Sequence, residues 1–106
     1  MKKEIRLMLE YQCYPIWIYD ENGNFVDNDL VKEIQNNRNL INLLEDLQQE
    51  FDSLYLDNQQ EFKYIGFKSS NDKVNFQKKI DTIYNYLNEI LCKKYNVKNM
   101  IDISRL

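Results

Sequence analysis

The fold is decided by residues 13–30, CYPIWIYDENGNFVDNDL. The apolar run 14–19 is too short for a helix and is rich in aromatic and β-branched side chains, which predicts a buried strand. The dipeptide Asn22-Gly23 predicts a type I′ turn with two positive φ angles, and residues 24–27 then return as a brief third strand. We therefore expect a hairpin near the centre of a sheet, with an acidic segment starting at its tip.

The segments on either side extend this hairpin. Residues 3–11 alternate between apolar and polar side chains, which predicts an antiparallel strand with one solvated face. Pro15 has no amide donor, so it should lie at the start of the second strand or beside an edge. After the third strand, Asp29 is expected to cap a short helical turn at 30–34.

Two long amphipathic helices are predicted, over residues 39–56 and 71–94. In each, apolar residues recur at steps of three and four, so that they form a single stripe. The stripes are Leu40, Leu44, Leu47, Phe51 and Leu54 in the first helix, and Phe76, Ile80, Ile83, Leu87 and Ile90 in the second. Ser69, three residues before Asp72, resembles a capping box and predicts the start of the second helix.

Two more strands are expected, over residues 61–68, where Gly66 indicates a bulge or a close backbone approach, and over 97–104. The predicted order is strand, strand, strand, helix, strand, helix, strand. A chain of 106 residues is the length of one domain, covering 1–106. The sequence therefore predicts an α+β fold in which both helices pack on one face of a mostly antiparallel sheet.

The composition limits the possible functions. The chain has no histidine, the most frequent general base, and its two glycines are too few for a phosphate-binding loop. Cys13 and Cys92 lack the spacing of a metal site and are expected to be core thiols in a reducing cytoplasm. We find no apolar run long enough for a membrane span or a signal peptide. A cytoplasmic protein without catalytic residues, metal or cofactor is expected.

Charge is unevenly distributed along the chain. Residues 20–61 contain eleven acidic and two basic side chains, whereas residues 62–106 contain nine basic and four acidic ones. We expect the hairpin tip and the first long helix to form one acidic region, which would suit a basic partner and speed its association. A solvated face that keeps the protein soluble is the alternative.

Three other functions are less well supported by the sequence. A calcium-binding loop starting at Asp20 would need glycine and glutamate where Phe25 and Val31 stand. Lysines beside Tyr84 and Tyr86 could suggest a nucleic-acid surface, but the isoelectric point of about 4.9 is unfavourable. Paired carboxylates could serve hydrolysis, yet eleven scattered acids can be paired in many ways.

Two stretches of the sequence carry a family resemblance. Residues 13–30, with CYPIWIYD, Asn22-Gly23 and DNDL, and residues 61–67, EFKYIGF, resemble small bacterial immunity proteins encoded beside polymorphic toxins, including those of contact-dependent growth inhibition. The resemblance implies a cytoplasmic inhibitor that binds one cognate toxin, often a basic nuclease, and blocks its active site or substrate path. It implies no catalytic residues.

The first hypothesis is therefore an immunity-type protein, a monomer or weak dimer, that binds a basic toxin through its acidic residues. The predicted partner-binding residues are Asp20, Glu21, Asp27, Asp29, Glu33, Glu45, Asp46, Asp52 and Tyr55. The alternative is a self-assembling or regulatory scaffold that uses a sheet edge or the apolar faces of Trp17 and Phe67. A carboxylate-dependent hydrolase is a third possibility.

Overall fold

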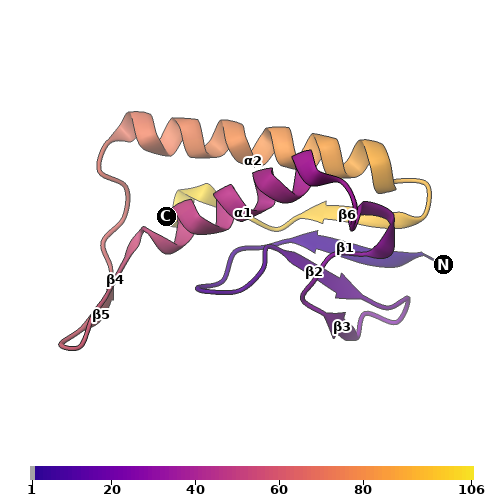
Figure 1. Cartoon of the computed structure of the whole chain (residues 1–106), viewed down its shortest axis with the longest axis horizontal. Helices are drawn as coiled ribbons and strands as arrows, with labels where there is room; N and C mark the ends of the chain where they lie inside the picture. The colour runs from indigo at the N-terminus through magenta and orange to yellow at the C-terminus, as the bar shows by residue number, and fades with distance from the viewer. Residues whose placement is uncertain (1) are drawn as a thin grey trace.

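A four-stranded sheet forms the base of the computed structural model, which describes residues 2–106 (Figure 1). Its strands are β1 (Lys3–Leu7), β2 (Ile16–Tyr19), β3 (Phe25–Asp27) and β6 (Tyr95–Asn99), in the order β3-β2-β1-β6. β2 pairs antiparallel with both β1 and β3. β6 pairs parallel with β1, an arrangement that a tight hairpin cannot make, and here the elements from β2 to α2 separate the two strands in sequence. The predicted α+β class and mostly antiparallel pairing are confirmed.

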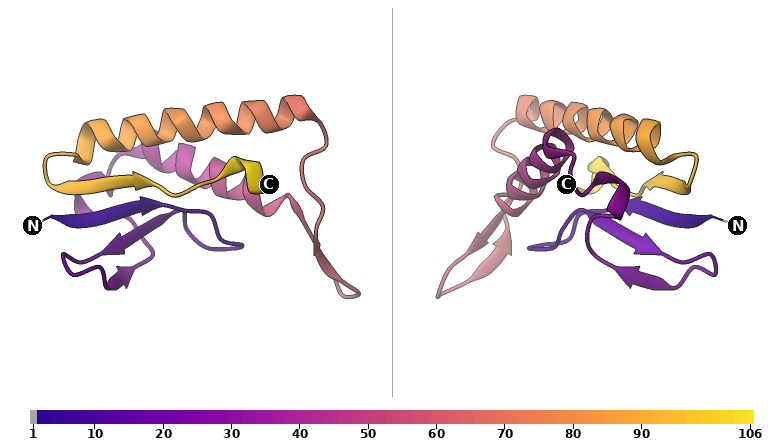
Figure 2. Two further views of the ribbon diagram at one scale, coloured as in Figure 1. Left: turned by 180° about the vertical axis from the view of Figure 1, so that it is seen from behind. Right: turned by 45° about the vertical axis from the view of Figure 1, so that its right-hand side comes forward.

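Two helices, α1 (Arg38–Asp52) and α2 (Ser70–Leu91), lie on the same face of this sheet (Figures 1 and 2). The side chain of Ser69 accepts a hydrogen bond from the Asp72 amide at 3.1 Å, so the predicted cap of α2 is confirmed. The helical stripes and the inner face of the sheet share one core. Its buried members include Ile5, Leu7, Ile16, Ile18, Leu40, Leu44, Leu47, Phe51, Phe76, Ile80, Ile83 and Leu87.

A separate antiparallel hairpin, β4 (Tyr55–Asp57) and β5 (Phe62–Tyr64), projects from this body (Figures 1 and 2). Its tip is closed by Asn58, whose amide donates to the Glu61 carbonyl at 3.0 Å and whose side-chain oxygen accepts the Glu61 amide at 2.9 Å. Over residues 2–106, no strand pairing joins the hairpin to the four-stranded sheet. Its orientation therefore depends on side-chain packing at its base.

The prediction of a helix over 39–56 was wrong beyond Asp52, because the chain enters β4 at Tyr55. The step from Phe51 to Leu54 continues the helical spacing, and Leu54 is indeed buried. However, the Leu54 carbonyl accepts the amide of Ile65 at 2.7 Å, which binds it to the chain that leaves β5. Pairing across the hairpin thus replaces the last helical turn.

The strand predicted over 61–68 is shorter, since β5 ends at Tyr64 and belongs to the projecting hairpin. Gly66 has a φ of 75°, a left-handed conformation that glycine adopts without steric penalty. Its amide donates to the Leu54 carbonyl at 3.0 Å. Gly66 therefore turns the chain out of the hairpin and towards α2.

The turn between β2 and β3 is not of type I′. A type I′ turn needs positive φ at both Asn22 and Gly23. Gly23 has a φ of 83°, but Asn22 does not have a positive φ, since Gln12 is the one non-glycine residue among residues 2–106 that does. The Gly23 amide donates to the Asp20 carbonyl at 3.1 Å, and the β2–β3 register shifts at Tyr19. This is a longer loop with one glycine in the left-handed region and an irregularity in the pairing. The predicted hairpin is confirmed, but its turn type was wrong.

The helical turn near 30–34 is a 3-10 helix over Lys32–Ile34, and Asp29 does not cap it. The side chain of Asp29 instead accepts the adjacent Leu30 amide at 2.7 Å. The helix starts after Val31, which is buried and makes no side-chain cap. Burial of an apolar residue fixes this start rather than a polar cap.

The C-terminal predictions were also too long. The helix predicted over 71–94 ends at Leu91, which is buried, whereas Ile90 is exposed. The strand predicted over 97–104 is β6, which ends at Asn99, followed by a 3-10 helix at Ile103–Arg105. The Asn99 side chain accepts the amide of Ile101 at 3.0 Å, which turns the chain away from the direction of β6.

A carboxylate on the open face of the sheet predicts a pH dependence of stability. Hydrogen bonds from Lys98, at 2.9 Å, and from Arg6 lower the pKa of Glu4 from its ordinary 4.5. As the pH falls the unfolded chain takes up the proton first, so this contribution is present above pH 4.5 and is lost on acidification. We expect Glu4→Gln to lower the free energy of unfolding by less than about 1 kcal/mol near neutral pH.

The measurement is urea unfolding of both proteins near neutral pH and again at about pH 3, well below the ordinary pKa of a glutamate. The difference between them should disappear in acid. A difference of equal size at both pH values would show that the substitution acts through packing.

Candidate partner-binding surface

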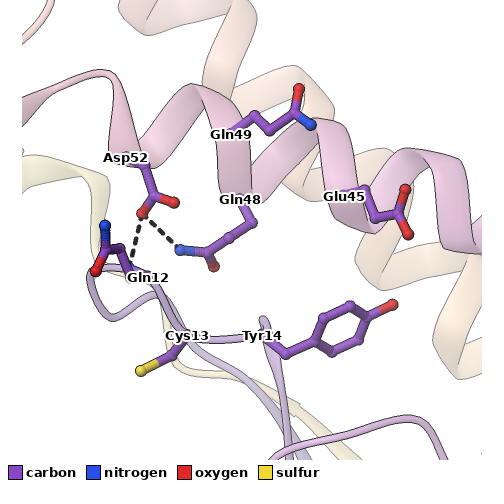
Figure 3. Close-up of a pocket in the computed structure, with 7 residues that line it drawn as sticks. All are labelled: Gln12, Cys13, Tyr14, Glu45, Gln48, Gln49 and Asp52. Atoms are coloured by element: carbon purple, nitrogen blue, oxygen red, sulfur yellow. Dashed lines mark hydrogen bonds between the residues drawn. The ribbon is translucent and has the colours of Figure 1, made fainter.

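A shallow groove lies between α1 and the loop of residues 10–14 that joins β1 to β2 (Figure 3). Its volume is about 370 Å³. The residues that line it are Gln12, Cys13, Tyr14, Glu45, Gln48, Gln49 and Asp52. On α1, Glu45, Gln48 and Asp52 follow one another at steps of three and four, so they lie along one side of the helix. One wall of the groove is therefore formed by carboxylate and amide side chains of α1, and the other wall is formed by the loop.

The loop is fastened to α1 by side-chain hydrogen bonds. The carboxylate Oδ1 of Asp52 accepts the Gln12 amide at 2.9 Å and the Gln48 Nε2 at 2.8 Å. The same Gln48 nitrogen donates to the Glu10 carbonyl at 2.9 Å. Gln12 has a φ of 57°, a left-handed conformation that is unfavourable for a residue with a side chain.

The other end of the loop is held by Asn28. Its Oδ1 accepts the Tyr14 amide at 3.0 Å, and its Nδ2 donates to the carbonyls of Tyr14 and Ile16 at 2.6 and 2.8 Å. Asn28 therefore replaces a strand partner for this stretch of backbone. Both ends of the loop are held by residues distant in sequence.

Two residues that line the groove each have a buried polar atom without a partner in the described part of the chain. Among residues 2–106, the Tyr14 hydroxyl and the Gln48 Oε1 are buried without a hydrogen bond. Burial, together with the charges of Glu45 and Asp29, raises the pKa of Tyr14 to about 12. The hydroxyl thus keeps its proton at neutral pH.

Three exposed carboxylates lie close to the tyrosines of this loop, and we call them the acidic strip: Asp29, Glu45 and Asp57. Burial and the charges of Glu45 and Asp29 raise the pKa of Tyr14. Burial, the hydrogen bond to Asp57 and the charges of Asp57 and Asp52 raise the pKa of Tyr11. The Tyr11 hydroxyl also donates to Asp57 Oδ2 at 3.0 Å. Within residues 2–106, none of the three forms an ion pair. All three side chains are exposed to solvent, whereas the neighbouring Asp52 is half-buried and its Oδ1 accepts two hydrogen bonds.

Other acids of the predicted set lie elsewhere. Asp46, with its neighbour Glu50, points to α2, where both bind the Lys79 ammonium at 2.6 and 2.5 Å. This ion-pair network joins the two helices. Asp46 therefore serves contacts within the molecule in the free protein.

A third group lies at the end of the sheet away from the 10–14 loop. Glu21 and Glu33 line a shallow pocket with four lysines: Lys2, Lys3, Lys32 and Lys94. Glu33 also accepts the Tyr95 hydroxyl at 2.8 Å and pairs with Lys94 at 3.6 Å. Positive charge dominates this end. The acids expected in one region are thus separated in space.

Two further aspartates hold the β2–β3 hairpin. Asp20 Oδ1 accepts the amides of Asn22 and Asn24 at 2.9 and 2.8 Å, and the backbone of Asn24 is the main cause that lowers the pKa of Asp20. Asp27 Oδ1 accepts the Asn28 amide at 2.8 Å. Both side chains shape local backbone, and a role for them with a partner stays a prediction.

Tyr55 belongs to an aromatic cluster at the base of the projecting hairpin. Its ring lies 4.9 Å from that of Tyr11, 5.5 Å from those of Phe51 and Phe62, and 5.2 Å from that of Tyr64. Tyr55 is half-buried, whereas Phe62 is 56% exposed. Phe62, which lies opposite Asp57 in the hairpin, is therefore an exposed aromatic side chain beside the acidic strip, and no pattern in the sequence indicated this role.

The apolar faces considered for a scaffold are partly covered. Trp17 lies 5.9 Å from Phe25 on the open face of the sheet, and its Nε1 donates to the Met8 carbonyl at 3.2 Å. Phe67 packs against Phe76 at 5.3 Å. Exposed apolar residues lie at the two hairpins, at Phe25, Val26, Phe62, Tyr64 and Ile65, and others lie on α2 and after β6, at Val74, Ile90 and Met100.

The cysteines do not form the expected pair of core thiols. Cys92 is exposed and Cys13 is half-buried, and both are free. Within residues 2–106 no three acidic or cysteine side chains are grouped so as to hold a metal ion. The same part of the chain contains no helix with the length and hydropathy that a membrane span needs.

The chain was compared with known proteins. A family model described as Serratia CdiI immunity protein-like matches residues 3–101, which is nearly the whole chain. A search among curated proteins for similar sequences found no match. The match includes the acidic strip, the 10–14 loop and the projecting hairpin.

Proposed function

The chain belongs to the Serratia CdiI immunity protein-like family, and we propose that it binds and neutralises one cognate toxin in the cytoplasm. The family match over residues 3–101 is the observation that carries this proposal. We further propose that the toxin domain is basic, as a nuclease is, and that it docks on the acidic strip. The unpaired carboxylates of the strip support this choice of surface.

The chemistry of a nuclease explains why such a surface would inhibit it. A protein that binds nucleic acid neutralises backbone phosphates with lysine and arginine, so its substrate path is positively charged. A row of fixed carboxylates offers those cations the same charge as phosphates. The acidic strip would therefore occupy the substrate path without any reaction, which fits a binding protein that needs no catalytic residue.

The neighbouring apolar side chains would add affinity. Charge complementarity mainly raises association rates and selects the partner, while buried aromatic anchors supply much of the binding energy. Phe62 is an exposed aromatic beside the strip, since its ring lies 5.0 Å from that of Tyr11, whose hydroxyl binds Asp57. The groove, the strip and the hairpin side chain would then form one continuous interface.

Co-expression with the toxin domain encoded beside this gene tests the proposal. We expect the chain to restore growth that the toxin alone abolishes, and to co-purify with the toxin as a complex. A toxin domain from a different system is the control and should remain toxic. Full toxicity in the presence of the folded chain, with no complex, would contradict the proposal.

Size-exclusion chromatography of the free chain at two concentrations distinguishes the scaffold alternative, which the exposed Phe62, Tyr64 and Ile65 would favour. An immunity protein that acts as a monomer should elute at the same volume in both runs. Growth of large assemblies with concentration would favour the scaffold.

A further inference from the structure

We infer that Asp52 supports toxin binding as a positioning residue, by holding the 10–14 loop in shape, and not through its charge. This inference rests on the proposed function, because it assigns roles within the same surface. It separates Asp52 from Glu45, the other carboxylate of the groove. Glu45 is exposed and no hydrogen bond to its side chain is seen within residues 2–106, so it is free to meet a cation.

The geometry of the turn shows what Asp52 holds. The Cys13 amide donates to the Glu10 carbonyl at 3.1 Å, so Glu10 to Cys13 form a four-residue turn. Gln12 is its third residue, with a φ of 57°, a place where turns of this kind favour glycine or asparagine. Asp52 accepts the Gln12 amide at 2.9 Å and so stabilises the one residue that the turn strains.

A second hydrogen bond links the same carboxylate to Gln48 of α1. Asp52 Oδ1 accepts a hydrogen bond from Gln48 Nε2 at 2.8 Å, and the same nitrogen donates to the Glu10 carbonyl. The first and third residues of the turn are thereby fixed to one helix. Without this acceptor, Gln12 would be free to leave its left-handed conformation, and the wall of the groove would change shape.

Two substitutions separate position from charge. Asp52→Asn keeps an oxygen that can accept both hydrogen bonds but removes the charge, whereas Asp52→Ala removes both. For binding to the cognate toxin domain, we expect Asp52→Ala to raise the Kd roughly tenfold, because preorganisation of the loop is lost, and Asp52→Asn to stay within about twofold. Equal loss in both variants would overturn the inference and assign Asp52 a charge role.

Glycine at position 12 offers a rescue. Glycine adopts positive φ without a steric penalty. Adding Gln12→Gly to Asp52→Ala should therefore recover part of the lost affinity. A double variant as weak as Asp52→Ala alone would count against a role through the turn.

A readout that needs no toxin keeps this inference separate from the proposed function. In a Cys92→Ser background, the half-buried Cys13 is the one thiol, and its rate of modification by a disulfide reagent reports the shape of the loop. Asp52→Ala should speed modification several-fold, with Asp52→Asn unchanged and the urea midpoint of both close to the parent. Identical rates in all three proteins would overturn the inference even if the toxin binds. If Cys13 is modified at the expected rates but the parent protein does not bind the toxin, only the proposed function is contradicted.

Discussion

Replacing Phe76 by alanine should lower the free energy of unfolding by about 3–5 kcal/mol, the cost of removing a buried phenyl ring. Phe76 is fully buried on α2, within the core that both helices share with the sheet. Its ring also packs against Phe67, which lies just before α2, at 5.3 Å. A domain of this size has a total stability of roughly 5–15 kcal/mol, so the substitution would remove a large part of it.

Urea unfolding followed by circular dichroism measures this effect. Val74→Ala is a matched control, since Val74 lies on the same helix but is 51% exposed, and it should change the stability by less than about 0.5 kcal/mol. Equal losses in the two variants would contradict the assignment of the buried stripe of α2.

The periodicity of the sequence predicted the parts of the fold that bury one face. The steps from Leu40 to Phe51 and from Phe76 to Leu87 lie on the buried sides of α1 and α2, as expected. The alternation of Ile5 with its polar neighbours likewise placed the inner face of β1. These predictions succeed because burial of one face is a local consequence of helical or strand geometry.

The partner of each strand could not be predicted in the same way. β6 pairs parallel with β1 because α2 carries the chain back across the sheet, which depends on the direction of a long connection. β4 and β5 have three residues each and are held by aromatic packing around Tyr55 and by the Leu54 carbonyl. Contacts of that kind join residues that are not related by any regular spacing in the sequence, so no periodic pattern predicts them.

The candidate site was predicted in composition but not in place. The acids of residues 20–61 are separated by their neighbours in space, because Lys79 of α2 comes to Asp46 and a lysine-rich end surrounds Glu21. Gln12 had no signal in the sequence, since a residue of this type is not expected at positive φ. Charge along a chain therefore predicts the charge of a surface only after opposite charges from distant segments are included.

Reversing the charge of Glu45 should weaken toxin binding more than any other single surface substitution proposed for this chain. We expect Glu45→Lys to raise the Kd roughly 10- to 100-fold at low salt, because one attraction is lost and a repulsion takes its place. Glu45 lines the groove, and within residues 2–106 it forms no ion pair that could absorb the change. Most of the effect should be seen in the association rate.

Glu21→Lys is the matched control, since it changes the net charge of the protein by the same amount at another exposed glutamate. It lies among lysines at the far end of the sheet, so the toxin should bind this variant within a few-fold of the parent. Raising the ionic strength shortens the screening length from about 30 Å at 0.01 M to about 8 Å at 0.15 M, which should narrow the gap between the two variants. If both substitutions weaken binding equally, the affinity depends only on the net charge of the protein. That result would contradict the proposal that the toxin docks on the acidic strip.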